Sequence, residues 1–264
     1  MRCRERCHRL STMRWRRSST AGVRCRTVCR KLSGLPSFGP ASRRLRLLDL
    51  GAGSGRIGRP FVQAGDDYTA VDRSFGMLRT FADRMRAARL AQADGACLPF
   101  ADASFDAVLL VQVLSGVPGW RHFLTDTLRV LRPGGTLIAG RVVAPDAGID
   151  ARMKTRLAEI LADIDIHPYR DKPRDAAMAW LACRLPGPTV LTAAAWQAER
   201  TPRGFLERHS GGARFSTLPE PVKQEALRRL AAWTAEQCGH LDTVCVEDYR
   251  FELTIHRLQP GTTH

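Results

Sequence analysis

Residues 49–58 read DLGAGSGRIG, a stretch in which two nucleotide-binding patterns overlap. From Gly53 the letters spell G-x-G-x-x-G, the pattern of a loop that cradles a dinucleotide pyrophosphate. From Asp49 they spell D-x-G-x-G-x-G, which places a carboxylate directly before the glycines. The sign of that charge bears on which ligand the loop can hold.

A pyrophosphate is favoured by the positive end of a helix, so an acid at position 49 opposes it. S-adenosylmethionine has no phosphate and carries a sulfonium and an ammonium cation, so Asp49 favours this cofactor. Asp72 discriminates poorly, because it would accept hydrogen bonds from a ribose diol in either cofactor. Asp94 discriminates better, since it lies where an adenine amino group could bind, with a backbone N–H near Ala96 for a ring nitrogen.

Alternating strands and helices must position these acids. The sequence predicts strands over 45–50, 67–72, 90–94, 105–114 and 135–143, and helices over 56–64, 77–88 and 120–131, the last stopped by Arg132–Gly135. This rhythm indicates a parallel sheet, in which ligands bind at the carboxyl ends of the strands. Three of the strands end in an acid, so we expect Asp49, Asp72 and Asp94 on one rim.

The rhythm changes after Pro145. Helices are predicted over 150–164, 173–184, 201–209 and 219–239, the last capped by Gly239, and strands over 189–199 and 244–258. The two late strands are expected to complete the sheet as an antiparallel pair. We expect one domain over 45–264, with a cofactor-binding core at 45–145, a lid and substrate region at 146–240 and the last strand at 244–258.

The motifs resemble a known family over roughly a third of the chain. The segments LLDLGAGSGR, AVDRSFGML, ADGACLPFADASFDAVLLVQVL and LRVLRPGGTLIAG, within residues 47–140, are similar to the class I S-adenosylmethionine-dependent methyltransferases, in the small-molecule branch that includes quinone-biosynthesis C-methyltransferases. The resemblance implies a Rossmann-like, doubly wound α/β fold with a mostly parallel seven-stranded sheet, an antiparallel last strand and a helical lid.

The same resemblance implies the cofactor-binding residues. Asp49, Gly51, Gly53 and Gly55 would surround the methionine part, Asp72 would hold the ribose, and Asp94, Gly95 and Ala96 would hold the adenine. Three further residues complete the expected cofactor site: Ala52, Arg73 and Val111. No metal is expected.

No catalytic residue is predicted. Methyl transfer from a sulfonium needs mainly positioning, and a base only where the acceptor arrives protonated. Relatives often carry histidine after the fourth strand, where this chain has Ser115 and Gly116. A base could come from His122, His167, His209 or His240, and an acceptor pocket could be lined by Trp120, Tyr169, Trp180 and Trp196, although such residues are more often structural.

The formal charge of +15 is concentrated near the start of the chain. Residues 1–46 hold 14 of the 41 Lys and Arg and a single acid, Glu5, which leaves the remainder near neutral. We expect residues 1–44 to be a disordered basic tail. Three interpretations of this tail are open: a non-functional extension, with Met13 or a later residue as the true start; a mitochondrial transit peptide; or an arm that touches RNA or lipid.

The remaining expectations concern partners and location. No run approaches the ~20 apolar residues of a membrane span, so we expect a cytoplasmic protein that acts on a small-molecule acceptor, or a mitochondrial one if the tail is a transit peptide. Of eight cysteines, four lie in the tail (Cys3, Cys7, Cys25 and Cys29) with only a faint zinc spacing, and the others are expected as small buried thiols. Two alternatives remain open: a nicotinamide-dependent oxidoreductase, and a non-catalytic protein that binds cofactor or nucleic acid.

Overall fold

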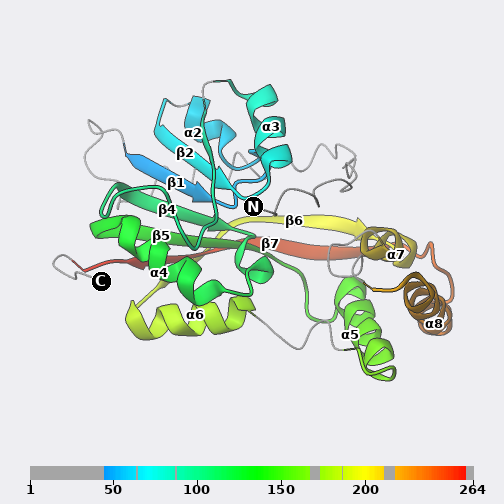
Figure 1. Ribbon diagram of the computed structural model, residues 1–264. Helices are drawn as coiled ribbons and strands as arrows, with labels where there is room; N and C mark the ends of the chain where they lie inside the picture. Colours follow the sequence, from blue (N-terminus) through cyan, green and yellow to red (C-terminus); the bar gives the residue numbers. More distant parts are fainter. Residues whose placement is uncertain are drawn as a thin grey trace, which may run out of the picture.

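The computed structural model describes residues 45–63, 65–86, 88–166, 173–185, 187–210 and 218–259. The expectations for the basic tail, His167 and Tyr169 lie outside these residues. Over the described part, seven strands form one sheet (Figure 1). They are β1 (Arg46–Leu50), β2 (Asp67–Asp72), β3 (Arg89–Gln92), β4 (Phe105–Val111), β5 (Leu131–Val143), β6 (Thr189–Arg200) and β7 (Cys245–Arg257).

The strand order is β3-β2-β1-β4-β5-β7-β6. The first five strands pair in parallel, and β7 runs antiparallel to both of its neighbours, β5 and β6. The predicted fold class, a mostly parallel seven-stranded sheet with an antiparallel last strand, is therefore confirmed. From β1 the chain adds β2 and β3 on one side, and it then returns to add β4 on the other side of β1. At such a switch point a crevice for ligands is expected outside the carboxyl ends of β1 and β4.

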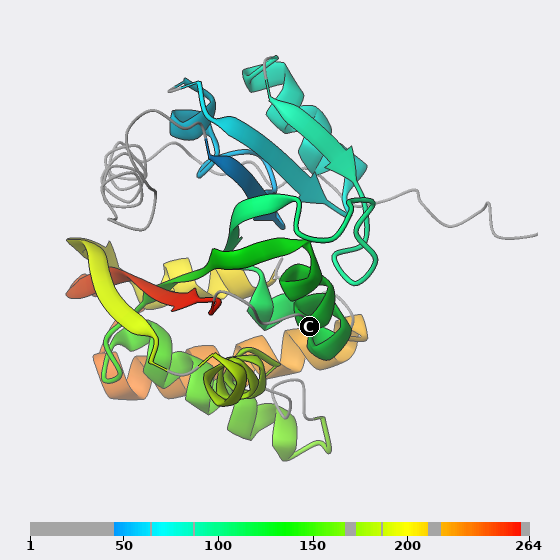
Figure 2. The same ribbon diagram turned by 90° about the vertical axis from the view of Figure 1, so that its left-hand side faces the viewer.

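Helices cover both faces of the sheet (Figures 1 and 2). On one face α4 (Trp120–Val130) and α6 (Pro173–Arg184) pack through residues such as Leu124 and Leu181. On the other, α2 (Arg59–Gln63) and α3 (Phe75–Arg84) contribute Phe61 and Phe81. The strands between them are nearly continuous in apolar residues because both faces are buried.

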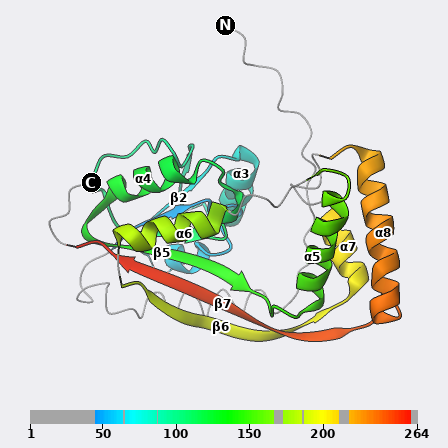
Figure 3. The same cartoon turned by 90° about the horizontal axis from the view of Figure 1, so that it is seen from below.

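A third group of helices packs around its own core. These helices are α5 (Ile149–Ala162), α7 (Pro202–Ser210) and α8 (Glu220–Cys238), and residues such as Met153, Phe205 and Leu230 fill the space between them. They lie beyond the carboxyl end of β5, beside the carboxyl end of β6 and the amino end of β7 (Figure 3). We call α5, α7 and α8 the lid group.

The buried Glu247 of β7 fastens the lid group to the sheet. Its carboxylate accepts a hydrogen bond from the N–H of Ile149, the first residue of α5, and another from the Tyr249 hydroxyl at 3.0 Å. A carboxylate at a helix N-terminus is favoured by the partial positive charge there. A Cβ on Gly148 would lie 2.9 Å from that carboxylate, so the absence of a side chain allows this contact.

Helix α6 differs from the sequence expectation. The sequence placed it in the lid region, but it packs on the sheet beside α4 through Ala177, Leu181 and Leu185. Its apolar spacing predicted a helix correctly but could not tell which surface the apolar face would meet. None of the described helices is both long and apolar enough to cross a membrane.

Most predicted element bounds hold within two residues, and several of the differences lie near the glycine loop. Helix α2 begins at Arg59 instead of residue 56, so Gly58 lies before the helix and not within it. Helix α3 begins at Phe75 instead of residue 77, because the Ser74 side chain caps it by accepting from the Met77 N–H at 3.4 Å. It also ends early, at Arg84.

Three strand bounds also differ. Strand β3 ends at Gln92, so Asp94 lies two residues beyond the strand and does not end it. Strand β4 ends at Val111 instead of residue 114, and a 3₁₀ helix, η2, follows at Leu114–Gly116. Strand β5 begins at Leu131 and includes the turn-like Arg132–Gly135 stretch, which the sequence assigned to a helix stop.

Candidate functional site

The loop from β1 to α2 turns on three glycines with positive φ. Gly51, Gly53 and Gly55 have φ values of 73°, 56° and 77°, a region that residues with a side chain adopt at a cost. The Gly51 and Ala52 N–H groups both donate to the Val71 carbonyl of β2, at 2.8 and 3.1 Å. These bonds hold the loop over the carboxyl ends of β1 and β2.

The three glycines have different surroundings. A Cβ on Gly51 would lie 2.6 Å from Val113, and one on Gly55 would lie 2.4 Å from the buried Phe81 ring. A Cβ on Gly53 would meet nothing within 4 Å. Gly51 and Gly55 are therefore required by packing inside the protein, whereas Gly53 faces open space at the rim of the sheet.

Asp72, the last residue of β2, fixes the same loop. One of its carboxylate oxygens accepts from the Gly53 N–H at 2.9 Å, and the other accepts from the Ser74 N–H at 2.8 Å. The side chain thus joins the loop after β1 to the loop after β2. Each oxygen retains a lone pair, so the carboxylate can still accept from a ligand hydroxyl.

Asp49 is only 1% exposed and lies one residue before the end of β1. The Tyr68 hydroxyl donates to its carboxylate at 2.5 Å. Burial raises the pKa of Asp49 to about 6, although the hydrogen bond from Tyr68 opposes the rise and the nearby Asp72 charge adds to it. The carboxylate is therefore held beneath the loop, in a setting where a neighbouring cation would stabilise its charged form.

Gly58 explains how Tyr68 reaches that position. A Cβ on Gly58 would lie 2.1 Å from the Tyr68 hydroxyl oxygen. Gly58 therefore packs closely against one specific hydroxyl group of β2. The last glycine of the dinucleotide-like pattern makes room for the Tyr68–Asp49 hydrogen bond.

Asp94 lies in the turn after β3, next along the rim. Its carboxylate accepts from the Ala96 N–H at 2.9 Å, which is the backbone donor that the sequence analysis offered to an adenine ring nitrogen. A Cβ on Gly95 would lie 2.2 Å from the Phe123 ring of α4, so this turn packs tightly on the helix. The neighbouring Arg73 is exposed, and its carbonyl accepts from the Gln92 side chain at 3.1 Å.

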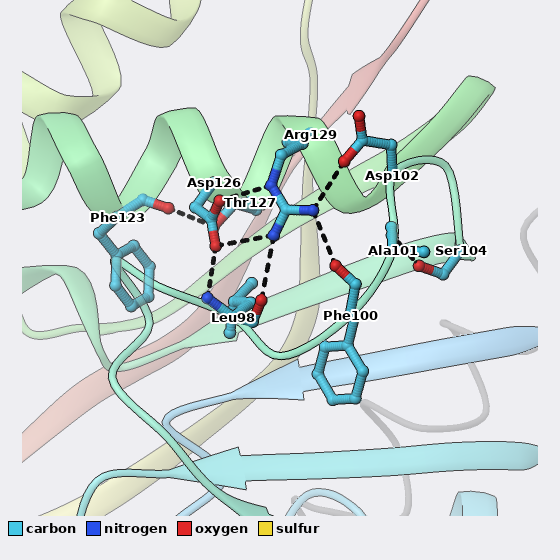
Figure 4. Close-up of polar contacts among 9 residues, drawn as sticks. All are labelled: Leu98, Phe100, Ala101, Asp102, Ser104, Phe123, Asp126, Thr127 and Arg129. Atoms are coloured by element: carbon cyan, nitrogen blue, oxygen red, sulfur yellow. Dashed lines mark hydrogen bonds and ion pairs between the residues drawn. The ribbon is translucent and has the colours of Figure 1, made fainter.

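The segment from Leu98 to Ser104 is fixed to α4 by one arginine (Figure 4). The Arg129 guanidinium donates to the carbonyls of Leu98 and Phe100, at 3.1 and 2.7 Å, and to the side chains of Asp102 and Asp126. Asp126 also accepts from the Leu98 N–H at 2.5 Å. This network holds in place the segment that carries the L-P-F-x-D-x-S-F-D string.

The charges in that network favour each other. Partial burial of the Asp126 carboxyl raises its pKa, but the hydrogen bonds from Arg129 and the Leu98 N–H, together with the Arg129 charge, outweigh it and hold the pKa below its usual range. Hydrogen bonds to Asp126 and Asp102 in turn raise the pKa of Arg129. The pair stays ionised across the physiological range.

The carboxyl end of β4 adds a residue that the sequence analysis missed. Gln112 follows Val111 with φ of 59°, an uncommon conformation for glutamine, and its N–H donates to the Gly140 carbonyl at 2.9 Å. Such backbone strain concentrates at functional sites. The side chain is exposed beside the glycine loop, since Gly51 packs on the adjacent Val113. No sequence signal indicates a left-handed glutamine.

The histidines considered as bases have surface or structural settings where they are described. His122 and His240 are exposed. His209 stacks on Phe205 with ring centroids 3.7 Å apart, and burial lowers its pKa. Of the aromatic residues, Trp120 packs edge-on against Trp180 and joins α4 to α6, while Trp196 stacks on Tyr249.

The cysteines correct one expectation. Cys97 and Cys183 are exposed and Cys238 and Cys245 are partly exposed, so the scattered thiols of the described chain are not the buried ones that the sequence analysis expected. No three His, Cys, Asp or Glu side chains of the described residues gather as a metal site would require.

Comparison with known proteins gives a match over the residues that carry the glycine loop and the three acids. Residues 48–139 match the family model described as a methyltransferase domain. A demethylmenaquinone methyltransferase of Renibacterium salmoninarum is 39% identical over 103 residues, which cover 39% of this chain and 44% of the relative. One from Tropheryma whipplei is 37% identical over 128 residues, 44% of this chain and 52% of the relative. The chain spans about half the length of the curated relatives it matches.

Solved structures extend the likeness in fold over most of the chain. The YcgJ protein of Bacillus subtilis matches with a TM-score of 0.57 at 15% identity, covering 89% of this chain and 99% of its own. A putative methyltransferase of Bacillus halodurans matches with a TM-score of 0.58 at 15% identity, covering 89% and 98%. Residues 48–139 are therefore similar to a methyltransferase domain, and the chain as a whole shares the fold of these two solved structures.

Proposed function

We propose that this protein binds S-adenosylmethionine on the loop between β1 and α2 and transfers its methyl group to a small-molecule acceptor. The observation that carries the proposal is the setting of Gly53. Its N–H is fixed by Asp72 at 2.9 Å, and the position its side chain would occupy is open. A ligand can approach the backbone closely only at such a position.

The side chains around that opening suit a phosphate-free cation. The Asp49 and Asp72 carboxylates lie under and beside the loop, where a sulfonium or ammonium group would lower the free energy of the buried Asp49 charge. A pyrophosphate would meet repulsion from both. The helix after the loop, α2, has only five residues and offers little dipole to an anion. These two features favour S-adenosylmethionine over a nicotinamide dinucleotide.

The proposed contacts follow the order of the rim. The methionine part lies against Gly51, Ala52, Gly53 and Gly55, with Asp49 beneath, and Asp72 accepts from the ribose hydroxyls. The adenine lies by Arg73 and the turn at Asp94, Gly95 and Ala96, with Val111 at the floor. Because the Ala96 N–H already donates to Asp94, an adenine ring nitrogen would have to share or replace that bond.

The chemistry asked of the protein is positioning. The bound cofactor supplies a methyl group on a sulfur that is already an activated leaving group. The chain holds donor and acceptor in line and excludes water, and such positioning is worth up to ~7–11 kcal/mol of the barrier. None of the described histidines is assigned as a base, so we propose an acceptor atom that reacts without one or loses its proton to solvent.

Labelled methyl transfer tests this proposal. The full chain is incubated with S-adenosylmethionine carrying a heavy-isotope methyl group and with mixed small-molecule acceptors. Demethylmenaquinone is among them because it appears in the names of the relatives. We expect S-adenosylhomocysteine and a labelled product in equal amounts, and neither with Asp72→Asn. Cofactor binding with no product in any acceptor set would favour the non-catalytic alternative.

The basic tail is proposed to be dispensable for this activity. Residues 1–46 carry most of the excess positive charge, whereas the rest is near neutral. A chain lacking residues 1–40 should keep its cofactor affinity, and we propose that it acts in the cytoplasm. A loss of salt-sensitive RNA binding together with unchanged cofactor affinity would assign a separate role to the tail.

A further inference from the structure

A cluster of arginines lies on the same rim as the glycine loop, on the side of β5 and β7. Arg141 of β5 donates to the Glu252 carboxylate of β7 through Nε and Nη2, at 3.2 and 3.0 Å. Arg250 lies 3.5 Å from the same carboxylate. The residue before Arg141, Gly140, pairs with Val111 at the end of β4 and accepts from the Gln112 N–H. The cluster is therefore level with the strained end of β4.

Helix α6 brings a third guanidinium to this place. Its last turn lies at the amino end of β5, because the Leu185 carbonyl contacts His256, which is paired with Leu137. Its first turn consequently lies at the carboxyl end, where Arg174 is half-buried and interacts electrostatically with Arg141 and Glu252. Helix α6 also packs against η2, directly after β4.

The cluster has an excess of positive charge. Among the described residues, Arg141, Arg174 and Arg250 face the carboxylates of Glu252 and, more exposed, Asp175. Three guanidinium groups against two carboxylates leave this group with one positive charge in excess. Burial, followed by the charge of Arg141, lowers the pKa of Arg174. One further negative charge would balance the group.

The position of this arginine cluster on the rim and its excess positive charge both bear on the methyl acceptor. The domain match ends at residue 139, so Arg141, Arg174 and Glu252 lie outside the part shared with the family model. We propose that Arg141 and Arg174 bind a carboxylate group of the acceptor and thereby select acidic small molecules. A planar carboxylate matches the fork of a guanidinium, and its single charge balances the cluster, which a phosphate dianion would exceed.

This inference rests on the proposed methyl transfer, and its test separates the two. The full chain saturated with S-adenosylhomocysteine is titrated with benzoate, phenylacetate and 4-hydroxybenzoate, with their primary amides, and with phenyl phosphate. We expect at least one acid to bind about tenfold more tightly than its amide. Failure of S-adenosylhomocysteine to bind would contradict the proposed function itself, whereas its binding without any acid preference would overturn only the inference.

Arginine variants test which side chains cause the preference for the acid over its amide. Arg174→Gln and Arg141→Gln should each lose about tenfold in affinity for the acid and keep that for S-adenosylhomocysteine and for the amide. Arg184→Gln removes the same charge from the exposed end of the same helix and should change none of these. The proposal is overturned if Arg184→Gln loses as much affinity for the acid as the other two variants, or if Arg174→Gln keeps the acid preference. Tighter binding of phenyl phosphate than of benzoate would also overturn it.

Discussion

Asp49 is a carboxyl group that the fold buries at a cost. Its pKa of about 6, against 3.8 for an ordinary aspartate, means that the folded protein holds a proton more tightly than the unfolded chain does. Between these values stability falls as pH rises, because the folded state must give up a proton it prefers to keep. A nearby cation would offset that cost, so cofactor binding and ionisation of Asp49 are coupled.

Replacement of Asp49 measures that cost. Asp49→Asn keeps a group that can accept from Tyr68 but cannot ionise, so its stability should exceed that of the wild type progressively as pH rises from about 4 to 7. A shift of about two pKa units corresponds to roughly 3 kcal/mol over this range. Urea unfolding across the range checks it. Parallel pH profiles for the two proteins would mean that Asp49 is not perturbed.

The glycines of the loop give a matched pair. Gly53→Ala and Gly55→Ala both force a side chain into positive φ, at about 1–2 kcal/mol each. Only Gly55→Ala also presses on the buried Phe81 ring, so it should lose an additional 1–3 kcal/mol or so. Gly53→Ala should instead lose most of its affinity for S-adenosylmethionine while its unfolding midpoint changes less. Equal effects of both variants on binding and stability would count against an open site at Gly53.

Spacing in the sequence was enough to propose the residues of the glycine loop and the acid after β2, but not the residues that depend on contacts between strands. The glycines and Asp72 follow from their spacing. The Tyr68–Asp49 bond does not, because it needs β2 to pair with β1 and Gly58 to make room. Gln112 could not be predicted either, since glutamine has no general preference for positive φ.

At the level of elements, Arg129 is the residue that joins the segment after β3 to α4. Arg129→Met keeps the apolar stem but leaves Asp126 without its charged partner, so we expect a loss of about 2–4 kcal/mol. Arg228→Met removes a fully exposed pair with Glu225, which water and salt screen, and should leave the free energy of unfolding nearly unchanged. Chemical denaturation of both variants checks the contrast, which disappears if the Arg129 network contributes nothing.

Glu247 has the corresponding role for the lid group. Glu247→Gln weakens the bond to the Ile149 N–H and removes the favourable charge at the start of α5, so hydrogen exchange should accelerate in the first turn of α5. The amides of β1 and β4 should exchange as in the wild type. Uniform acceleration over the whole sheet would indicate global destabilisation instead of local release of the lid group.

Element types were predictable because their periodicities are strong, but their packing partners were not. The apolar spacing of residues 173–184 gave a helix with the observed bounds, yet its place on the sheet depends on tertiary contacts such as that between Trp120 and Trp180. The start of α3 was missed by two residues because the prediction followed apolar spacing and not the Ser74 cap.

For the whole molecule, the two sites that we propose lie in two different regions. The edge β3-β2-β1-β4 carries the three acids and the glycine loop that we assign to the cofactor. The part formed by β5, β7, β6, α6 and the lid group lies mostly beyond the matched domain. Its β5 and α6 supply the arginines that we assign to the acceptor. The first part followed from sequence motifs, whereas the second emerged only from tertiary contacts.

Isothermal titration calorimetry of the full chain with S-adenosylmethionine and, separately, with NAD at neutral pH tests the central claim most directly. We predict saturable one-to-one binding of S-adenosylmethionine, no detectable binding of NAD, and at least about tenfold weaker binding of S-adenosylmethionine to Asp72→Asn. Binding of NAD with none of S-adenosylmethionine, or equal affinity of Asp72→Asn for S-adenosylmethionine, would contradict the account.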